Sequence, residues 1–356
     1  MKKIKRTLLA FSLVALFLLS ACATNGGAPG AAEETTAPAV APAAIEPALP
    51  IQDGVIPSLE GFTIGVAAIG TSHGFDRLAF VGMIERIEEL GGTVIAVDGE
   101  RDDQRHISNI ENLIIQRPDA IINMLGDGAI LEPILRRVAE SGIPLFTVDH
   151  NSAYAVSNVS SDNFGIGTGL AQRIFADMGG DGQVAVFNGF YGVRVAQIRY
   201  HMLHAVAQDY PRIGFVEPEL IDVIPGTIES ARRDVQDLLM RYPRGSGLRA
   251  IWAAWDIPSI GAAQAVDEAG RGDEVMVYGI DGDLTALRMV IDPNSSFMAN
   301  MAQNPRAIGS AAVDQAALHL NGFRVPPSVY VPPTLVTAEN YVTALAELGL
   351  TLEDLN

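Results

Sequence analysis

The sequence predicts an α/β fold with parallel β-sheets, and three observations support this prediction. Short apolar runs typical of buried strands alternate along the chain with stretches of helical periodicity. Glycines follow several helical stretches, where a left-handed residue ends a helix at little cost, and one αβ pattern occurs twice. The predicted strands are Thr63–Ile69, Thr93–Val97, Ala120–Asn123, Leu145–Val148, Gln183–Phe187, Ala250–Ala254 and Val275–Ile280. The helical stretches include Ile107–Gln116, Ile130–Ser141, Ile228–Met240 and Ile260–Ala269.

The repeated pattern consists of a strand, a helix and a second strand that ends in aspartate. Its first copy runs from Ala120 to Asp149 and its second from Ala250 to Asp281, with a glycine after the helix in each. The spacings are 29 and 31 residues. Because the two copies share this register, we expect two related Rossmann-like domains.

The first 22 residues have the features of an export signal. Four cations precede the apolar run Leu8–Leu19, which is too short to cross about 30 Å of hydrocarbon as a helix. Leu19-Ser20-Ala21-Cys22 resembles the bacterial lipobox, in which the cysteine is lipidated. We therefore expect residues 1–21 to be a signal peptide and Cys22 to carry a lipid anchor. The protein would then be held at the cell membrane outside the cytoplasm, in the periplasm or on the outer face of the cytoplasmic membrane. An ordinary signal peptide with an incidental cysteine is the alternative.

Residues 22–58 are rich in Ala, Pro, Gly, Thr and Glu and contain few large apolar side chains. Such a segment cannot bury enough surface to offset its ordering entropy, so we expect a flexible tether. As a random coil it would reach about 30–35 Å from the membrane.

Charge and cysteine usage exclude two features. The formal net charge is −18, and the removal of residues 1–21, which hold four cations and no acidic residue, would leave −22. Recognition of nucleic acid needs a basic face, so nucleic acid is excluded as a partner. Because Cys22 is the only cysteine, the exported chain has no intramolecular disulfide.

Polar and aromatic side chains follow the predicted strands, at the edge where open parallel sheets bind ligands. Carboxylates accept hydrogen bonds from hydroxyls, Arg and Gln donate them, and aromatic rings cover apolar C–H faces, a combination that suits a sugar. Any single aspartate could instead be a helix cap or turn residue, but Asp149 and Asp281 are the strongest candidates because both end strands in equivalent registers. Phe190-Tyr191 stand in a further loop of this kind. The full set of candidates is His73, Phe75, Asp76, Asp149, His150, Arg199, Trp255, Asp256, Asp281 and Gln303.

Several soft motifs, taken in order, give the chain a resemblance to a known family. They are Ile107-Ser108-Asn109-Ile110-Glu111-Asn112-Leu113-Ile114 after Asp98, Gly142-Ile143-Pro144-Leu145-Phe146-Thr147-Val148-Asp149, Arg199, Ala253-Ala254-Trp255-Asp256, Gly279-Ile280-Asp281-Gly282 and Ala302-Gln303. From Phe62 to about Asn340 the chain thereby resembles the periplasmic sugar-binding proteins of ribose-type ABC importers. The resemblance implies a type I periplasmic binding protein fold, with two lobes joined by a hinge.

The resemblance also implies a role for each candidate. One aromatic ring would stack on the sugar, four polar residues would bond its hydroxyls, two residues would lie at the rim of the cleft, and one would take the place of a polar ligand-binding residue. The ring that stacks would be that of Phe75, and the residues that bond the hydroxyls would be Asp149, Arg199, Asp281 and Gln303. The residues at the rim would be Trp255 and Asp256, and the one in place of a polar ligand-binding residue would be His73.

Three positions depart from the family's pattern and leave the identity of the sugar open. Asp76 stands where a second aromatic is common, His150 where an arginine often follows the aspartate, and Trp255 where asparagine is frequent.

The implied function follows from two lobes that close on a sugar. The N-terminal lobe would comprise residues 59–162 and 304–329, and the C-terminal lobe residues 163–303 and 330–356. The closed form would be read by the permease of an ABC transporter. We expect a monomer with no enzymatic activity, cofactor or metal.

Two other functions stay open on the sequence. A sensory receptor could use the same binding body to signal through a membrane kinase. A serine hydrolase could use Ser72, because Gly70-Thr71-Ser72-His73-Gly74 has the G-x-S-x-G pattern, but no earlier strand exists to supply a second oxyanion donor. His201 and His204 lie one helical turn apart, but a zinc site needs a third ligand.

Overall fold

The computed structural model describes residues 55–188 and 193–355, which belong to one compact unit. Among them, no helix is both long and apolar enough to cross a bilayer. The predicted signal peptide (1–21), the lipidation site Cys22 and nearly all of the predicted tether (22–58) lie outside the described residues, as do Phe190 and Tyr191.

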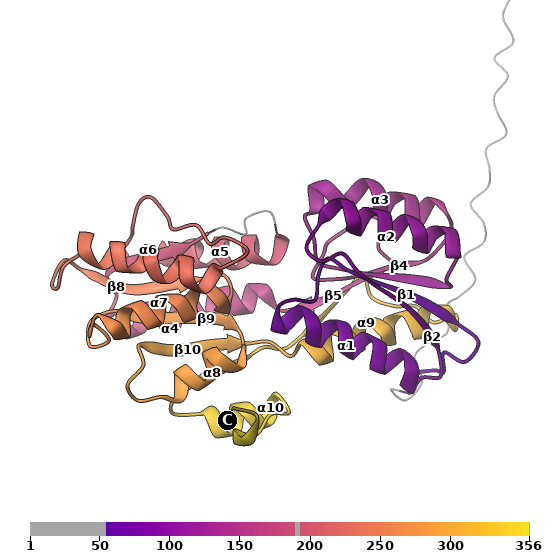
Figure 1. Cartoon of the computed structure of the whole chain (residues 1–356). Coiled ribbons are helices and arrows are strands. Elements are labelled where there is room, and N and C mark those ends of the chain that lie inside the picture. Colours follow the sequence, from indigo (N-terminus) through magenta and orange to yellow (C-terminus); the bar gives the residue numbers. More distant parts are fainter. Residues whose placement is uncertain (1–54, 189–192, 356) are drawn as a thin grey trace, which may run out of the picture. The chain divides into compact units, whose positions relative to one another are not determined.

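The first sheet has six parallel strands in the order β11-β5-β4-β3-β1-β2. Side chains alternate between its two faces: Ile64 and Val66 of β1 join one apolar cluster, whereas Ala67 joins the other. Helices cover both faces (Figure 1), so the central strands β3 and β4 are buried along their whole length. The strands are β1 (Thr63–Ala68), β2 (Thr93–Asp98), β3 (Ala120–Met124), β4 (Leu145–Val148), β5 (Ser157–Ser161) and β11 (Ser328–Val331). The helices are α1 (Gly74–Glu89) and α9 (Pro305–Leu320) on one face, and α2 (Asp103–Gln116) and α3 (Gly128–Glu140) on the other.

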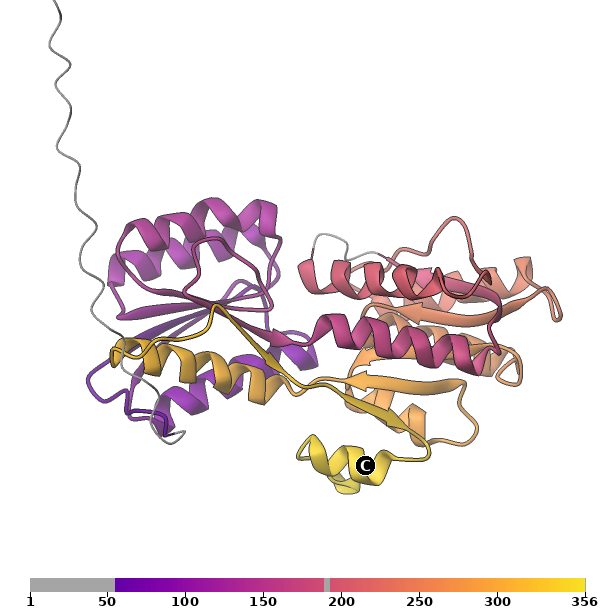
Figure 2. The same ribbon diagram turned by 180° about the vertical axis from the view of Figure 1, so that it is seen from behind.

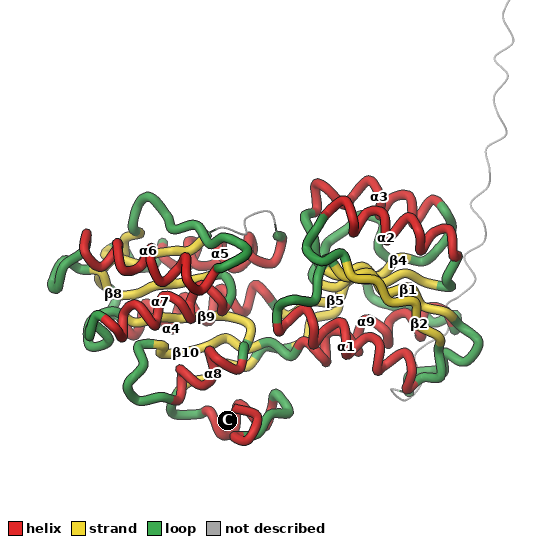
Figure 3. Tube along the Cα trace, in the orientation of Figure 1, coloured by secondary structure: helices red, strands yellow, loops and turns green. Residues whose placement is uncertain are grey.

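The second sheet also has six strands, in the order β12-β10-β9-β8-β6-β7, and only β12 runs antiparallel to its neighbour. Trp252 and Tyr278 face one helical layer, and Ile251 and Val277 face the other. In Figure 3 the strands of each sheet lie between helices. The strands are β6 (Asp181–Phe187), β7 (Arg212–Phe215), β8 (Leu248–Ala253), β9 (Met276–Asp281), β10 (Phe297–Ala302) and β12 (Thr334–Thr337). The helices are α4 (Asn163–Asp177) and α5 (Arg194–Ala207) on one face, and α6 (Thr227–Arg241), α7 (Asp256–Glu268), α8 (Leu284–Ile291), α10 (Tyr341–Glu347) and the short 3-10 helix Leu352–Leu355 on the other.

The two sheets repeat one topology. If the first five strands of each are numbered in chain order, both sheets have the order 2-1-3-4-5. Asp149 follows the fourth strand of the first sheet, and Asp281 ends the fourth strand of the second. The helices before these strands end at glycines with positive φ, Gly142 at +81° and Gly270 at +61°. The predicted α/β fold with two related halves is therefore confirmed.

The chain passes from one sheet to the other three times. It crosses between β5 and α4, between β10 and α9, and between β11 and β12 (Figure 2). The first two crossings coincide with the lobe boundaries expected at 162/163 and 303/304. The third lies at residues 332–333, because β11 pairs with β5 through Val331, two residues beyond the expected boundary at 329/330. The division into two moving lobes stays a prediction.

Candidate ligand-binding site

A cavity of about 470 Å³ lies where the loops at the carboxyl ends of both sheets meet. Its volume falls within the range of small-molecule sites, roughly 300–1,000 Å³. Eight of the ten predicted site residues line it: His73, Phe75, Asp76, Asp149, Arg199, Trp255, Asp281 and Gln303. The other two, His150 and Asp256, do not line it. Whether any of these side chains contacts a ligand stays a prediction.

Asp149 follows β4 directly and has a φ of +51°, which turns the chain sharply at the end of the strand. Its carboxylate is 3% exposed and accepts a hydrogen bond from Ser160 Oγ at 2.5 Å. Asn163 Nδ2 donates to the same Ser160 oxygen at 2.9 Å. Burial raises the pKa of Asp149, and the Ser160 hydroxyl and Arg199 offset part of this rise. The Asp149 carboxylate is thus a buried hydrogen-bond acceptor in the wall of the cavity.

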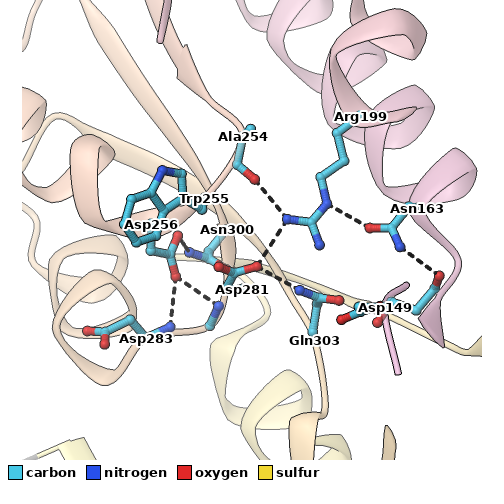
Figure 4. Close-up of polar contacts among 12 residues, drawn as sticks. Asp149, Asn163, Arg199, Ala254, Trp255, Asp256, Asp281, Asp283, Asn300 and Gln303 are labelled. Carbon is cyan, nitrogen blue, oxygen red and sulfur yellow. Dashed lines mark hydrogen bonds and ion pairs between the residues drawn. The ribbon is translucent and has the colours of Figure 1, made fainter. Parts of the chain in front are cut away.

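Arg199 comes from α5 and is 3% exposed. Its Nε donates to Asn163 Oδ1 at 2.7 Å, and its Nη1 donates to the carbonyl of Ala254 at 2.8 Å and to Asp281 Oδ1 at 3.2 Å (Figure 4). These bonds fix the plane of the guanidinium, so its remaining donors point in set directions.

Asp281 ends β9 with a φ of +123°. Besides Arg199, its Oδ1 accepts from Gln303 Nε2 at 2.6 Å. Burial raises the pKa of Asp281 to about 6, although Arg199 and Gln303 favour its charged form. Gln303 Oε1 is buried without a hydrogen-bond partner among the described residues, so the hydrogen-bonding capacity of this acceptor is unused. We call Asp149, Asn163, Arg199, Asp281 and Gln303 the Arg199 cluster.

Asp256 lies behind this cluster, where its carboxylate holds the loop that follows β9. Its Oδ2 accepts from the backbone amides of Gly282 at 2.8 Å and Asp283 at 2.7 Å, and its Oδ1 accepts from Asn300 Nδ2 at 2.6 Å (Figure 4). Burial, followed by the nearby charge of Asp281, raises its pKa well above the ordinary range. Asp256 also lines a further cavity, which shares His73, Trp255 and Asp281 with the first, and its expected place at the rim of the cleft stays a prediction.

His150 also lies behind the cavity wall. It is 2% exposed, and its Nδ1 is 3.3 Å from the carbonyl oxygen of Gly126, a residue that does line the cavity. Burial lowers the pKa of His150, so the ring is neutral at pH 7.

A second polar cluster lines the cavity at the ends of β1 and β2, and sequence reasoning missed its central residue, Arg101. The Arg101 guanidinium forms an ion pair with Asp76, and its Nη2 lies 2.6 Å from Nδ1 of His73. The His73 ring is 5.1 Å from the Trp255 ring, centroid to centroid, and the indole N–H of Trp255 donates to Asp222. We call His73, Asp76 and Arg101 the Arg101 cluster.

A usable signal for Arg101 existed in the sequence. It lies shortly after a predicted strand, beyond Asp98-Gly99. The expectation that ligand-binding side chains follow the carboxyl ends of the strands therefore applies to this loop as well. Two further carboxylates line the cavity without having been predicted as site residues, Asp103 and Asp127. The other lining residues have apolar side chains or none and carry no chemical signal: Ile69, Leu125, Gly126, Val193, Val195, Ala196, Ile224 and Ala254.

The alternative sites gain no support from the described residues. No group of three or more His, Cys, Asp or Glu side chains is placed to hold a metal ion there. His204 instead stacks on Tyr200, with ring centroids 4.3 Å apart. Ser72 is exposed, and no hydrogen bond links its side chain to an imidazole in the part of the chain that the structure describes.

Two related α/β halves with a cavity at the carboxyl ends of their strands are typical of solute-binding proteins, and comparison with known proteins identifies the family. A family model described as a periplasmic binding protein domain matches residues 64–323. The chain belongs to this family, whose members bind solutes outside the cytoplasm and are not enzymes.

Several relatives make the comparison more specific. The solved structure of an ABC sugar transporter subunit from Rhodobacter sphaeroides is 48% identical, with a TM-score of 0.78 over 80% of this chain and 100% of that one. A solute-binding protein from Agrobacterium vitis with bound allitol is 41% identical, with a TM-score of 0.79 over 82% and 100%. The Ribose import binding protein RbsB of Bacillus subtilis is 26% identical over 78% of this chain and 87% of its own.

Proposed function

We propose that this protein captures a sugar or a sugar alcohol in the cavity and delivers it to the permease of an ABC importer. The observation that carries the proposal is the Arg199 cluster, in which a cation, two carboxylates and an amide are fixed around one cavity. Arg199 donates, Asp149 and Asp281 accept, and Gln303 keeps an unpartnered acceptor. A polyhydroxylated molecule matches this mixture because each hydroxyl both donates and accepts.

The proposed ligand is neutral rather than anionic because both arginines that line the cavity already have carboxylate partners. Arg199 pairs with Asp281, and Arg101 pairs with Asp76. Phe75 and Trp255 add flat apolar surface that can cover C–H groups. A few charged hydrogen bonds at about 1.5–3 kcal/mol each suffice for a micromolar dissociation constant, near −8 kcal/mol.

The relatives support the same class of ligand. The protein from Agrobacterium vitis was solved with allitol, that from Rhodobacter sphaeroides is an ABC sugar transporter subunit, and the relative from Bacillus subtilis is a ribose import binding protein. We extend to this chain only what these ligands share, several hydroxyls on a short carbon skeleton.

Delivery would depend on closure of two lobes about the three crossing segments. The ligand can shift the balance between open and closed forms only by binding the closed form more tightly. In this proposal Cys22 carries a lipid, residues 22–58 are a tether, and the monomeric binding body captures solute without changing it.

The test combines thermal unfolding with small-angle scattering. Pentoses, hexoses and sugar alcohols are added singly to the purified protein, and the correct ligand raises the melting temperature and reduces the radius of gyration. In Arg199→Gln the guanidinium is lost and both effects should disappear. The matched control is Arg212→Gln, because Arg212 lies at the surface and pairs with Asp181 away from the cavity. If no compound in the panel shifts the melting temperature, the proposed function is wrong.

A further inference from the structure

We propose that the Arg101 cluster is a second hydroxyl-binding subsite of the cavity, and that it makes the protein selective for an open-chain polyol over a ring sugar. This inference rests on the proposed function and specifies the class of ligand. It assigns a role to Arg101, which was not among the predicted site residues.

The local backbone is built to hold Arg101 in the cavity wall. Its amide donates to the carbonyl of Ile69 at 2.7 Å, so the loop after β2 is tied to the end of β1. Arg101 itself has a φ of +61°, an unusual conformation for a residue with a side chain. The Arg101 side chain passes directly over Gly70, where a Cβ would come within 2.7 Å of Arg101 Cγ. Any larger residue at position 70 would displace the guanidinium.

The cluster has hydrogen-bonding capacity left over after its internal contacts. Arginine can only donate, so His73 Nδ1 must accept at their 2.6 Å contact, and the neutral ring carries its proton on Nε2. Burial, with the charge of Arg101, lowers the pKa of His73 to about 4, which keeps the ring neutral at pH 7. Arg101 Nε is buried with no partner among the described residues. The cluster therefore offers donors on Arg101 and His73 beside the carboxylate of Asp76.

The position of the cluster separates it from the Arg199 cluster. His73 and Asp76 follow β1, Arg101 follows β2, and Asp149 follows β4, with β3 between them in the sheet. Neighbouring strands lie about 4.8 Å apart, so β1 and β4 are separated by about 10 Å. A ligand that bonds to both clusters must carry hydroxyls at both ends of an extended skeleton.

An open chain meets this requirement better than a ring. Every carbon of a polyol bears a hydroxyl, and rotation about its single bonds lets terminal hydroxyls reach both clusters. A ring sugar is compact and presents nearly apolar faces. If such a face lay against Arg101 and Asp76, it would remove water from these charged groups without replacing their hydrogen bonds, which is costly.

The first experiment measures dissociation constants by calorimetry for matched pairs, in each of which the polyol is the reduced, open-chain counterpart of a ring sugar. Each hexitol (allitol, galactitol, mannitol, sorbitol) is compared with the aldose from which it is made (allose, galactose, mannose, glucose), and ribitol is compared with ribose. We expect at least one polyol to bind about tenfold or more tightly than its aldose, the difference made by one charged hydrogen bond.

The second experiment tests whether the Arg101 cluster causes the preference. Arg101→Gln should weaken polyol binding about tenfold or more while changing aldose binding much less. The control is Arg137→Gln, which removes the same charge from an exposed pair with Glu111 in the same half of the molecule and should change neither. If Arg101→Gln lowers the ligand-free melting temperature, the same binding measurements are made on Arg101→Lys, which keeps a cation beside Asp76.

The possible outcomes distinguish a failure of this inference from a failure of the proposed function. If no polyol binds more tightly than its aldose while some member of a pair does bind, or if Arg101→Gln and Arg101→Lys weaken both members of a pair equally, the inference is wrong and the proposed function stands. If no member of any pair binds, both are wrong.

Discussion

Asp149 and Asp281 occupy equivalent positions in the two halves of the molecule, yet their surroundings differ. Each follows or ends the fourth strand of its sheet, each has a positive φ, and burial raises the pKa of each. Asp149 is bonded by a neutral hydroxyl, that of Ser160, whereas Asp281 is bonded by Arg199 and Gln303. The topology thus fixes where a carboxylate stands, and the side chains from neighbouring elements decide whether its charge is compensated.

The largest effect that tests this comparison comes from replacing each aspartate with asparagine. Asp281→Asn removes a buried charge but leaves the buried Arg199 without its carboxylate, so we expect these two effects to offset each other in the free energy of unfolding and ligand affinity to fall about a hundredfold. Asp149→Asn removes a buried charge that has no ion-pair partner within hydrogen-bonding distance. It should weaken binding about tenfold yet raise the ligand-free melting temperature.

Chemical denaturation and calorimetry on the two variants measure these quantities. Equal changes in stability would contradict the difference drawn between the two sites. Because Asn has nearly the same shape as Asp, we do not expect either variant to change the backbone.

The next effect is a dependence of ligand affinity on pH that arises from Asp281. Its pKa of about 6 in the folded protein lies above the ordinary carboxyl value because of burial, with the charges of Arg199 and Asp149 acting in opposite directions. In the ligand-free protein, protonated Asp281 makes its full contribution to the free energy of unfolding below the ordinary carboxyl pKa. This contribution is lost as the pH rises through about 6. Ligand hydroxyls donate to the ionised form, so affinity should rise between pH 5 and pH 7, by about tenfold if only that form binds.

Calorimetry across this pH range checks the prediction, with Asp281→Asn as the control that should show a flat profile. His73 is not expected to contribute, because its pKa of about 4 keeps it neutral throughout this range. A profile with the same slope in the variant would exclude Asp281 as its source.

The smallest effect is expected at Asp256, which supports Asp281 from behind. In Asp256→Asn the remaining oxygen can still accept from the amides of Gly282 and Asp283. The new amide can donate to Asn300, whose Oδ1 is buried and unpartnered among the described residues and can turn to face it. Affinity should change less than about threefold, whereas Asp256→Ala, which frees the loop, should cost about tenfold. Equal effects of the two variants would show that the charge matters rather than the bonds.

The sequence was sufficient to predict the fold and much of the cavity, for physical reasons that differ between residues. Buried parallel strands are continuous apolar runs, so β1, β3, β4 and β8 were evident, and the aspartates at their ends could be placed. By contrast β5 is Ser-Asn-Val-Ser-Ser, buried but polar, and no hydrophobic pattern marks it. Its Ser160, which positions Asp149, was therefore missed.

Side-chain direction was the second limit. Asp256 stands in the first turn of α7, and its sequence position is equally compatible with a carboxylate that faces the cavity or one that accepts from a neighbouring loop. Only the packing of β9 and β10 against α7 brings Gly282 and Asn300 to it. Arg101 likewise depends on the backbone bond to Ile69, a contact between loops that no local pattern encodes.

The three crossings between the sheets have a consequence for how the chain can be made. Neither half is a continuous stretch of sequence: β11 completes the edge beside β5, and β12 the edge beside β10, and both come within the last 30 residues. A chain that stopped before Ser328 would expose two open strand edges at once, the kind of surface through which proteins aggregate. Neither sheet can therefore be completed until residues 328–337 are available, although most of the strands of both come earlier in the chain.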